Sequence, residues 1–194
     1  MPVPSKADIA KRKANRDKLA KKITADGHLK DGELVRIVRK AIDAAWMTAA
    51  NKLVLLEDRV IPDMNPNTRT KWLIKCDHCG NLFKLTDVQV DHIVGEFPCT
   101  EPEHFFDYIM NRLDVGFDDL QVLCIEDHQI KTLAERNGIS FEEARIEKQA
   151  IAICKGSVSS VKAFLSERGI TPAGNAENRR KQVLEALKRE VTNE

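Results

Sequence analysis

The sequence of 194 residues has no long apolar run, few aromatic residues and no excess of charge of one sign. No stretch approaches the roughly 18 apolar residues that a bilayer span requires, and the start lacks the apolar segment of a signal peptide. We therefore expect no contact with a membrane and a cytoplasmic location. Aromatic residues make up 5% of the chain, and 31 basic residues face 30 acidic ones, so composition alone identifies no partner.

The balanced net charge hides an uneven distribution along the chain. Residues 1–30 contain 9 basic and 3 acidic residues, whereas residues 76–136 contain 4 basic and 13 acidic ones. An acidic centre between basic flanks suits a protein that binds cations in its middle and a polyanion at its ends. Ordinary solvated helix faces would produce the same pattern.

Apolar spacing predicts that most of the chain is helical. Alanine, isoleucine and leucine lie between the lysines of the first segment, which favours a basic helix over 6–22 that ends near Gly27. Later apolar residues recur at intervals of three and four, the pattern of amphipathic helices. These helices are expected over 31–51, 102–113, from about 124–126, over 140–154, from 158 to Gly169, and from Asn175.

Two short antiparallel strands are expected near the middle of the chain. Trp72-Leu73-Ile74 and Leu82-Phe83 bracket a pair of cysteines, and Val88-Gln89-Val90 alternates in polarity. We interpret the pair as lying on a tight turn at Gly80, with the second strand delivering Asp91-His92. The helix that follows completes a strand, strand, helix unit.

The cysteines predict a metal site before a disulfide. Five is an odd number, and two of them form Cys76-Asp77-His78-Cys79. In a reducing compartment this spacing is typical of metal binding.

An acidic residue beside a histidine, with a second histidine later in the chain, can provide the metal ligands and the general base of a nuclease. Phosphodiester hydrolysis needs a positive centre, a base that deprotonates water and a fixed geometry between them. We assign Asp91 and His128 as ligands of one divalent metal ion, which leaves coordination positions for phosphate and water. His92 is the expected general base, because histidine titrates near neutral pH. Asp119 is expected to bond a ring N–H or a backbone group and so orient that imidazole.

These pieces resemble the HNH endonuclease family, particularly compact HNH proteins of bacteriophages. The matching motifs lie within residues 40–136 and are Cys76-Asp77-His78-Cys79-Gly80, Val88-Gln89-Val90-Asp91-His92-Ile93, Leu120-Gln121-Val122-Leu123-Cys124 and His128-Gln129-Ile130-Lys131-Thr132. The resemblance implies an α+β, mostly helical fold: a central ββα-metal finger, flanked by N-terminal helices and a C-terminal helical tail. It implies nicking or double-strand cleavage of DNA with Mg²⁺ or Mn²⁺, in the cytoplasm of a phage-infected bacterium.

Two positions depart from the family pattern. Asp119 stands where asparagine is usual, and its carboxylate would favour the protonated form of His92 and could attract metal. Asp127 stands where the fourth zinc cysteine is usual. Activity is expected, but these positions leave open a DNA-binding or assembly protein on an HNH scaffold whose chemistry has lapsed. A zinc-stabilised module that binds protein partners is a third hypothesis.

The same resemblance assigns a structural Zn²⁺ to three thiolates and one carboxylate. Its ligands would be Cys76, Cys79, Cys124 and Asp127. The alternatives are that Cys99 or His78 completes the site, or that the cysteines are buried thiols without zinc.

Basic residues outside the acidic centre are the expected DNA contacts. The candidates are Lys131, Lys11, Arg12, Lys13, Arg16, Arg179, Arg180 and Lys181. The last three lie in a segment, 157–190, that loosely resembles helix-extension-helix modules such as SAP domains, with simple packing or an oligomer contact as the alternative. We expect a basic arm over 1–30, a nuclease domain with a leading helix over 31–136, and a C-terminal helical module over 137–194. Expected partners are DNA and either a second copy of the chain or another phage protein.

Overall fold

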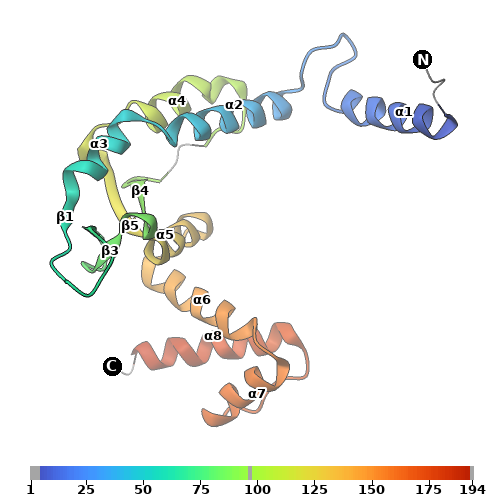
Figure 1. Ribbon diagram of the computed structural model, residues 1–194. Helices are drawn as coiled ribbons and strands as arrows, with labels where there is room; N and C mark the ends of the chain where they lie inside the picture. Colours follow the sequence, from blue (N-terminus) through green and yellow to red (C-terminus); the bar gives the residue numbers. More distant parts are fainter. Residues whose placement is uncertain (1–4, 96–97, 193–194) are drawn as a thin grey trace. The chain divides into compact units, whose positions relative to one another are not determined.

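The computed structural model describes residues 5–95 and 98–192, and it is an α+β, mostly helical protein, as expected. Short 3-10 turns, η1 (Leu85–Asp87), η2 (Pro102–His104) and η3 (Phe117–Asp119), connect several elements. The longer elements (Figure 1) are α1 (Lys6–Ala20), α2 (Asp31–Trp46), α3 (Ala50–Arg59), β1 (Val60–Pro62), β2 (Trp72–Lys75), β3 (Leu82–Lys84), β4 (Val88–His92), α4 (Phe105–Leu113), β5 (Leu120–Cys124), α5 (Ile125–Asn137), α6 (Phe141–Cys154), α7 (Val158–Glu167) and α8 (Ala176–Thr192). Among the described residues, none of these helices combines the length and apolarity needed to cross a bilayer.

The chain folds into two compact units that do not follow the expected division at residues 30 and 136. Unit 1 comprises Met1–Ile74 and Val90–Val122, and unit 2 comprises Lys75–Gln89 and Leu123–Glu194. The difference arises because α5 packs on α6 through a small core of Ile130, Ala134 and Ala144. The cysteine turn and α5 therefore group with the C-terminal helices.

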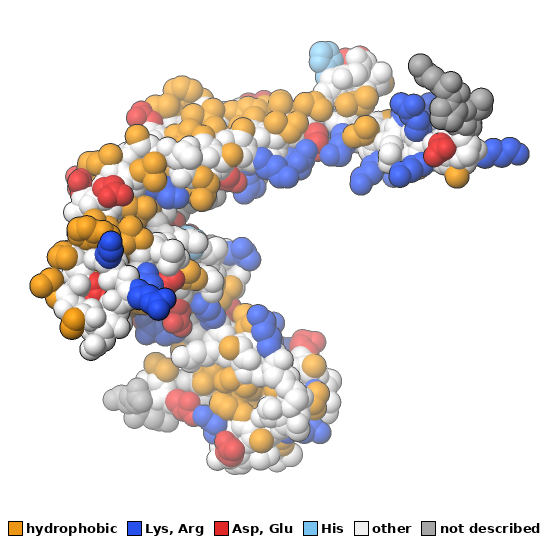
Figure 2. Space-filling model, viewed as in Figure 1, with side chains coloured by type: hydrophobic (Ala, Val, Ile, Leu, Met, Phe, Trp, Pro, Cys, Tyr) orange, Lys and Arg blue, Asp and Glu red, His pale blue; other side chains and the backbone are white. Residues whose placement is uncertain are grey.

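In unit 1 the helices α2 and α4 lie side by side (Figure 1) and bury a common core. Val35, Cys99 and Tyr108 form its centre. The start of α3 is tied to the end of α4, because Asn51 donates from Nδ2 to the carbonyls of Leu113 and Val115, each at 3.0 Å. The basic helix α1 has no buried residue, and lysine and arginine side chains gather along it (Figure 2).

The strands differ from the expected hairpin. The tight turn is present, since Gly80 has φ +74° and its N–H donates to the carbonyl of Cys76 at 3.0 Å. However, the strand after the turn, β3, ends at Lys84, and β4 pairs with β5. The expectation that one strand runs from the turn to His92 was wrong because η1 interrupts it. The buried residues Val88 and Val90 therefore belong to a second, two-stranded sheet.

The three-stranded sheet has the order β1-β2-β3. Strands β1 and β2 are antiparallel, with Val60 opposite Ile74 and Pro62 opposite Trp72.

Unit 2 is dominated by the helices α5 to α8. Its main core consists of Ile146, Ala150, Val161, Leu165, Val183 and Leu187. The expected helix boundaries in this region are confirmed by their caps. Ser140 and Glu143 form a capping box at the start of α6, and Asn175 Oδ1 accepts from the N–H of Asn178 at 2.7 Å at the start of α8.

Leu165→Ala tests this core, because the side chain is completely buried. We expect the free energy of unfolding to fall by about 2–5 kcal/mol, from lost burial and the cavity left behind. Urea unfolding followed by helical circular dichroism measures the change. The control is Val158→Ala on the same helix, where the side chain is 56% exposed and the expected change is small. Equal losses in the two variants would show that α7 does not pack as described.

Candidate functional site

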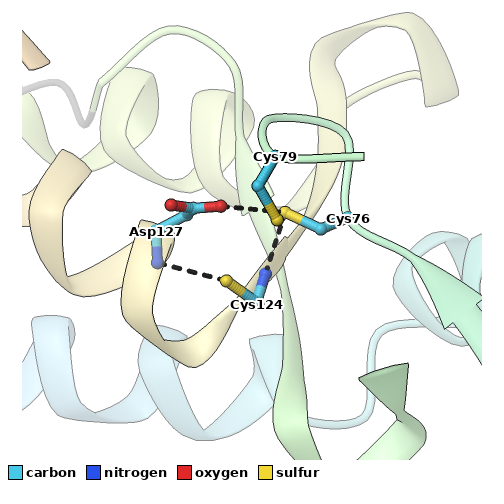
Figure 3. Close-up of side chains that lie close together, drawn as sticks. All are labelled: Cys76, Cys79, Cys124 and Asp127. Atoms are coloured by element: carbon cyan, nitrogen blue, oxygen red, sulfur yellow. Dashed lines mark hydrogen bonds between the residues drawn. The ribbon is translucent and has the colours of Figure 1, made fainter. Parts of the chain in front are cut away.

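Three cysteines and one aspartate of unit 2 converge on a common point (Figure 3). Cys76 and Cys79 lie on the turn that follows β2, while Cys124 caps α5 and Asp127 lies in the first turn of that helix. One ligand atom from each lies within 4.8 Å of all the others. The structure thus brings together the four residues named as zinc ligands, and this group could hold a metal ion.

Hydrogen bonds link three of the four residues of this group, which we call the metal cluster. The Cys76 thiol donates to Asp127 Oδ2 at 3.2 Å, and the Cys76 sulfur accepts the N–H of Cys124 at 3.3 Å. The Cys124 sulfur accepts the N–H of Asp127, also at 3.3 Å. The helix start therefore directs backbone N–H groups at sulfur, an arrangement that favours thiolates.

Burial and neighbouring groups change the acidities within the cluster. Burial raises the pKa of the Cys124 thiol to about 12 and also raises the pKa of Cys79. For Asp127, burial acts to raise the pKa, but hydrogen bonds from the surrounding thiols, Cys76 first, outweigh it and lower the pKa. These shifts favour a charged carboxylate on Asp127 beside protonated thiols on Cys79 and Cys124. A divalent cation would replace the thiol protons, so metal binding should release protons and tighten as pH rises.

The alternative ligands lie elsewhere. Cys99 belongs to unit 1, where it is buried with Val35 and Tyr108. The ring of His78 lies 3.9 Å from that of Phe141, and its Nε2 is 3.5 Å from Arg145 Nη2. Among the described residues, neither Cys99 nor His78 joins the group of potential ligands.

In unit 1, the strand β4 ends at a buried histidine whose ring is tightly positioned. His92 is 6% exposed, and its Nε2 lies 3.1 Å from the carbonyl oxygen of Arg112. Arg112 Nη1 lies 3.3 Å from Nδ1 of the same ring. A carbonyl only accepts and a guanidinium only donates, so these contacts select the tautomer with hydrogen on Nε2 and a lone pair on Nδ1. The ring of Trp46 covers the imidazole, with centroids 4.6 Å apart.

His92 lines a cleft of about 340 Å³ within unit 1. Three carboxylates and one amide contribute to the same cleft, which are those of Asp114, Asp118, Asp119 and Asn111. The cleft therefore combines an oriented imidazole with a concentration of negative charge. Such a surface attracts cations, and it can receive a phosphate only if a cation or the nearby guanidinium offsets the charge.

Asp119 occupies this cleft but contacts its own turn. Its Oδ2 accepts the N–H of Gly116 at 3.0 Å, and its backbone carbonyl accepts the N–H of Ile93 at 2.8 Å. The second bond fixes Asp119 beside the end of β4. The contacts that orient the imidazole come instead from Arg112 and Trp46.

Sequence reasoning missed Arg112. Its Nη2 lies 3.7 Å from Asp43 Oδ1, and the hydroxyl of Tyr108 donates to that same oxygen at 3.4 Å. This network connects α2 and α4 to the histidine. The available signal was the scarcity of cations in residues 76–136, where Arg112 is one of 4.

The predicted metal ligands Asp91 and His128 belong to different units. Asp91 is partly buried on β4 in unit 1. His128 is partly buried on α5 in unit 2, where its carbonyl accepts the hydroxyl of Thr132 at 2.8 Å. Lys131 lies on the same helix and forms an ion pair with Glu135.

Of the eight predicted DNA contacts, six are exposed, Lys131 is partly buried and Arg179 is buried. Lys11, Arg12, Lys13 and Arg16 are exposed on α1, as are Arg180 and Lys181 on α8. Arg179, however, is only 8% exposed and donates to the carbonyls of Ala173 and Gly174 at 2.9 and 2.6 Å. The prediction that Arg179 contacts DNA was therefore wrong, because its guanidinium holds the segment before α8.

Titration with Co²⁺ tests the metal cluster, because thiolate coordination produces a characteristic absorption. We expect one ion to bind per chain, with an affinity that rises with pH as thiol protons are displaced. Cys76→Ser and Cys124→Ser should abolish the thiolate band. Cys99→Ser and Cys154→Ser are the controls and should leave it unchanged. A band that survives loss of Cys76 and Cys124 would mean that the ion binds elsewhere.

Comparisons with known proteins identify no relative of this chain. No family model matches it, and neither a curated protein nor a solved structure matches it. The chemistry of the metal cluster and of the His92 cleft therefore has to follow from their own residues.

Proposed function

We propose that the protein is a metal-dependent endonuclease of the HNH type that hydrolyses phosphodiester bonds of DNA. The observation that supports this most directly is the His92 cleft. A histidine that directly follows an aspartate is fixed there in one tautomer, with the Nδ1 lone pair toward a guanidinium. The order of motifs along the chain, which resembles that of HNH nucleases, supports the same conclusion.

In the proposed reaction the cleft residues act on one water molecule and one phosphate. Asp91 and His128 are the metal ligands predicted from the sequence, and Mg²⁺ or Mn²⁺ would supply the positive charge that stabilises the developing negative charge on phosphate. Arg112 would exchange its contact with His92 Nδ1 for a contact with a phosphate oxygen when DNA binds, because a planar guanidinium is well suited to donate to phosphate. His92 Nδ1 then accepts a proton from the attacking water, while the carbonyl of Arg112 keeps the ring in place.

The metal cluster has a structural role in this proposal. Three thiolates and one carboxylate are a tetrahedral ligand set that suits Zn²⁺. Bound zinc would fix the cysteine turn to the start of α5, the helix that carries His128. With β4 and β5 this arrangement would complete a ββα-metal finger.

The basic residues exposed on α1 would provide affinity for DNA without sequence preference. Because α1 buries no residue, its contribution depends on charge and not on packing. Lys131, Arg180 and Lys181 are further candidates for phosphate contacts.

Cleavage of supercoiled plasmid tests the proposal. In the presence of Mg²⁺ or Mn²⁺ we expect the parent protein to nick or cut, and His92→Ala to lose activity by about 10²–10⁴-fold, the contribution of a general base. His104→Ala is the matched control, since that histidine contacts Thr100 and lies outside the cleft lining, so this variant should stay active. Plasmid binding without cleavage by both parent and His92→Ala would overturn the enzymatic proposal.

A non-cleaving DNA-binding protein is the second candidate, and a specific observation favours it. Both ring nitrogens of His92 already have hydrogen-bond partners, so the base is restrained until Arg112 moves. The carboxylate of Asp119 adds negative charge to the cleft that must receive phosphate.

Asp119→Asn separates the two candidates. Asparagine keeps an oxygen that can accept the N–H of Gly116 but removes the charge. We expect the cleavage rate to rise, by about tenfold for an interaction worth 1.4 kcal/mol in the transition state. Asp107→Asn on α4 is a control outside the cleft lining. An unchanged rate would show that this carboxylate does not restrain the reaction.

A further inference from the structure

An exposed tryptophan that has no role in the proposed function lies on the β1-β2 hairpin of unit 1. Trp72 is 52% exposed, whereas Trp46, the other tryptophan of the chain, is 5% exposed. Trp72 opens β2 and lies opposite Pro62, which is also exposed. Met64 in the connecting loop is 85% exposed, and hydrophobic side chains lie at the surface of this part of the molecule (Figure 2). The hairpin therefore presents a flat aromatic ring and apolar neighbours to solvent.

The hairpin is rigid although its loop is exposed. The N–H of Asp63 donates to the carbonyl of Lys71 at 3.0 Å, which extends the strand pair beyond Pro62 and Trp72. The carboxylate of Asp63 accepts from the hydroxyl of Thr68 at 2.6 Å and from the N–H of Asn65 at 2.9 Å. A surface ordered in this way loses little conformational freedom when it binds a partner.

The charge around the ring favours an anionic partner. Residues 59–72 contain the cations Arg59, Arg69 and Lys71 and the single acid Asp63. Arg69 and Lys71 are exposed on the segment that leads into Trp72. Lysine is depleted from the cores of protein interfaces whereas tryptophan, methionine and arginine are enriched there, so a second protein chain is the competing occupant of this surface.

An aromatic face beside cations is the arrangement by which proteins bind unpaired nucleotides. Bases stack on the ring, and the cations contact the backbone phosphates. In an intact duplex the faces of the bases are already stacked on one another. An exposed ring of this kind is therefore suited to bind unpaired bases and not a continuous duplex.

We propose that the β1-β2 hairpin binds unpaired bases of DNA by stacking on Trp72, with Arg69 and Lys71 contacting the phosphates. This rests on the proposed function for the choice of DNA as the nucleic acid. It narrows the substrate class to DNA that contains single-stranded, nicked or branched segments.

Binding is measured in the His92→Ala background without added Mg²⁺ or Mn²⁺, so that cleavage does not interfere. Fluorescence anisotropy compares the binding of a labelled single strand with that of a mixed-sequence duplex. The single strand has about 15 thymidines, a length that spans typical single-strand sites. We expect Trp72→Ala to weaken single-strand binding about tenfold or more and to leave duplex binding unchanged. Trp72→Phe should retain most of the affinity, because phenylalanine still stacks. Phe106→Ala removes another exposed ring, 71% exposed on α4, and serves as the control.

Intrinsic fluorescence provides a second readout. Because Trp46 is buried, the emission of an exposed tryptophan should come from Trp72 and be quenched by the single strand. Equal effects of Trp72→Ala on single strand and duplex, or no effect on either, would overturn the proposal. The proposal would also be overturned if sedimentation showed the parent protein as a dimer and Trp72→Ala as a monomer. That result would assign the surface to a second copy of the chain.

The plasmid assay distinguishes failure of this inference from failure of the proposed function. If the protein cuts DNA but its single-strand binding does not depend on Trp72, only the proposal for Trp72 fails. If the protein binds single strands through Trp72 but does not cut DNA, only the nuclease proposal fails.

Discussion

The chemistry of unit 1 depends on the need of a buried imidazole to satisfy both of its nitrogens. Buried polar groups that lack hydrogen bonds are costly, and His92 meets this requirement with two different atoms of one residue, Arg112. The backbone carbonyl accepts the N–H of Nε2, and the guanidinium donates a hydrogen bond to the lone pair of Nδ1. Only the second contact can be exchanged for another without unfolding the local backbone. In the proposed reaction the same arrangement would hold the ring in the free protein and release Nδ1 when a phosphate attracts Arg112.

The metal cluster applies a comparable constraint in unit 2. Around it, the buried core is small and consists of Cys76, Leu123 and Cys124, with Phe83 packed at its side. A core of this size contributes little hydrophobic stabilisation, and the cluster places protonated thiols against a carboxylate at its centre. Exchange of the thiol protons for a divalent ion would convert weak hydrogen bonds into coordination bonds. The cluster is thus better suited to hold the turn on α5 with an ion than without one.

The sequence predicted what depends on local pattern and missed what depends on contacts over long distances. The capping box at Ser140 and the turn at Gly80 follow from residues three or four positions apart, and the structure has both. The pairing of β4 with β5 joins segments about 30 residues apart in the chain, and the apolar run before Cys124 could as well have begun a helix. Arg112 was missed for a similar reason, because its partners His92 and Asp43 lie on other elements. Arg179 shows the opposite error, since a basic residue in a helix was assigned to DNA although it binds backbone carbonyls.

The two surfaces proposed to bind DNA differ in how much order they have before binding. Helix α1 has no buried side chain, so packing contributes little to its stability in water, and isolated helices of this length are marginal. The free energy needed to order the helix would therefore reduce its affinity for DNA. The β1-β2 hairpin is already braced at Asp63, and its tryptophan is exposed in the free protein. The charges of α1 attract DNA through an electrostatic interaction that salt screens. An aromatic ring instead makes a short-range stacking contact, which requires that the bases are unpaired. The helix is consequently suited to capture DNA of any form, and the hairpin to select which part of it is held.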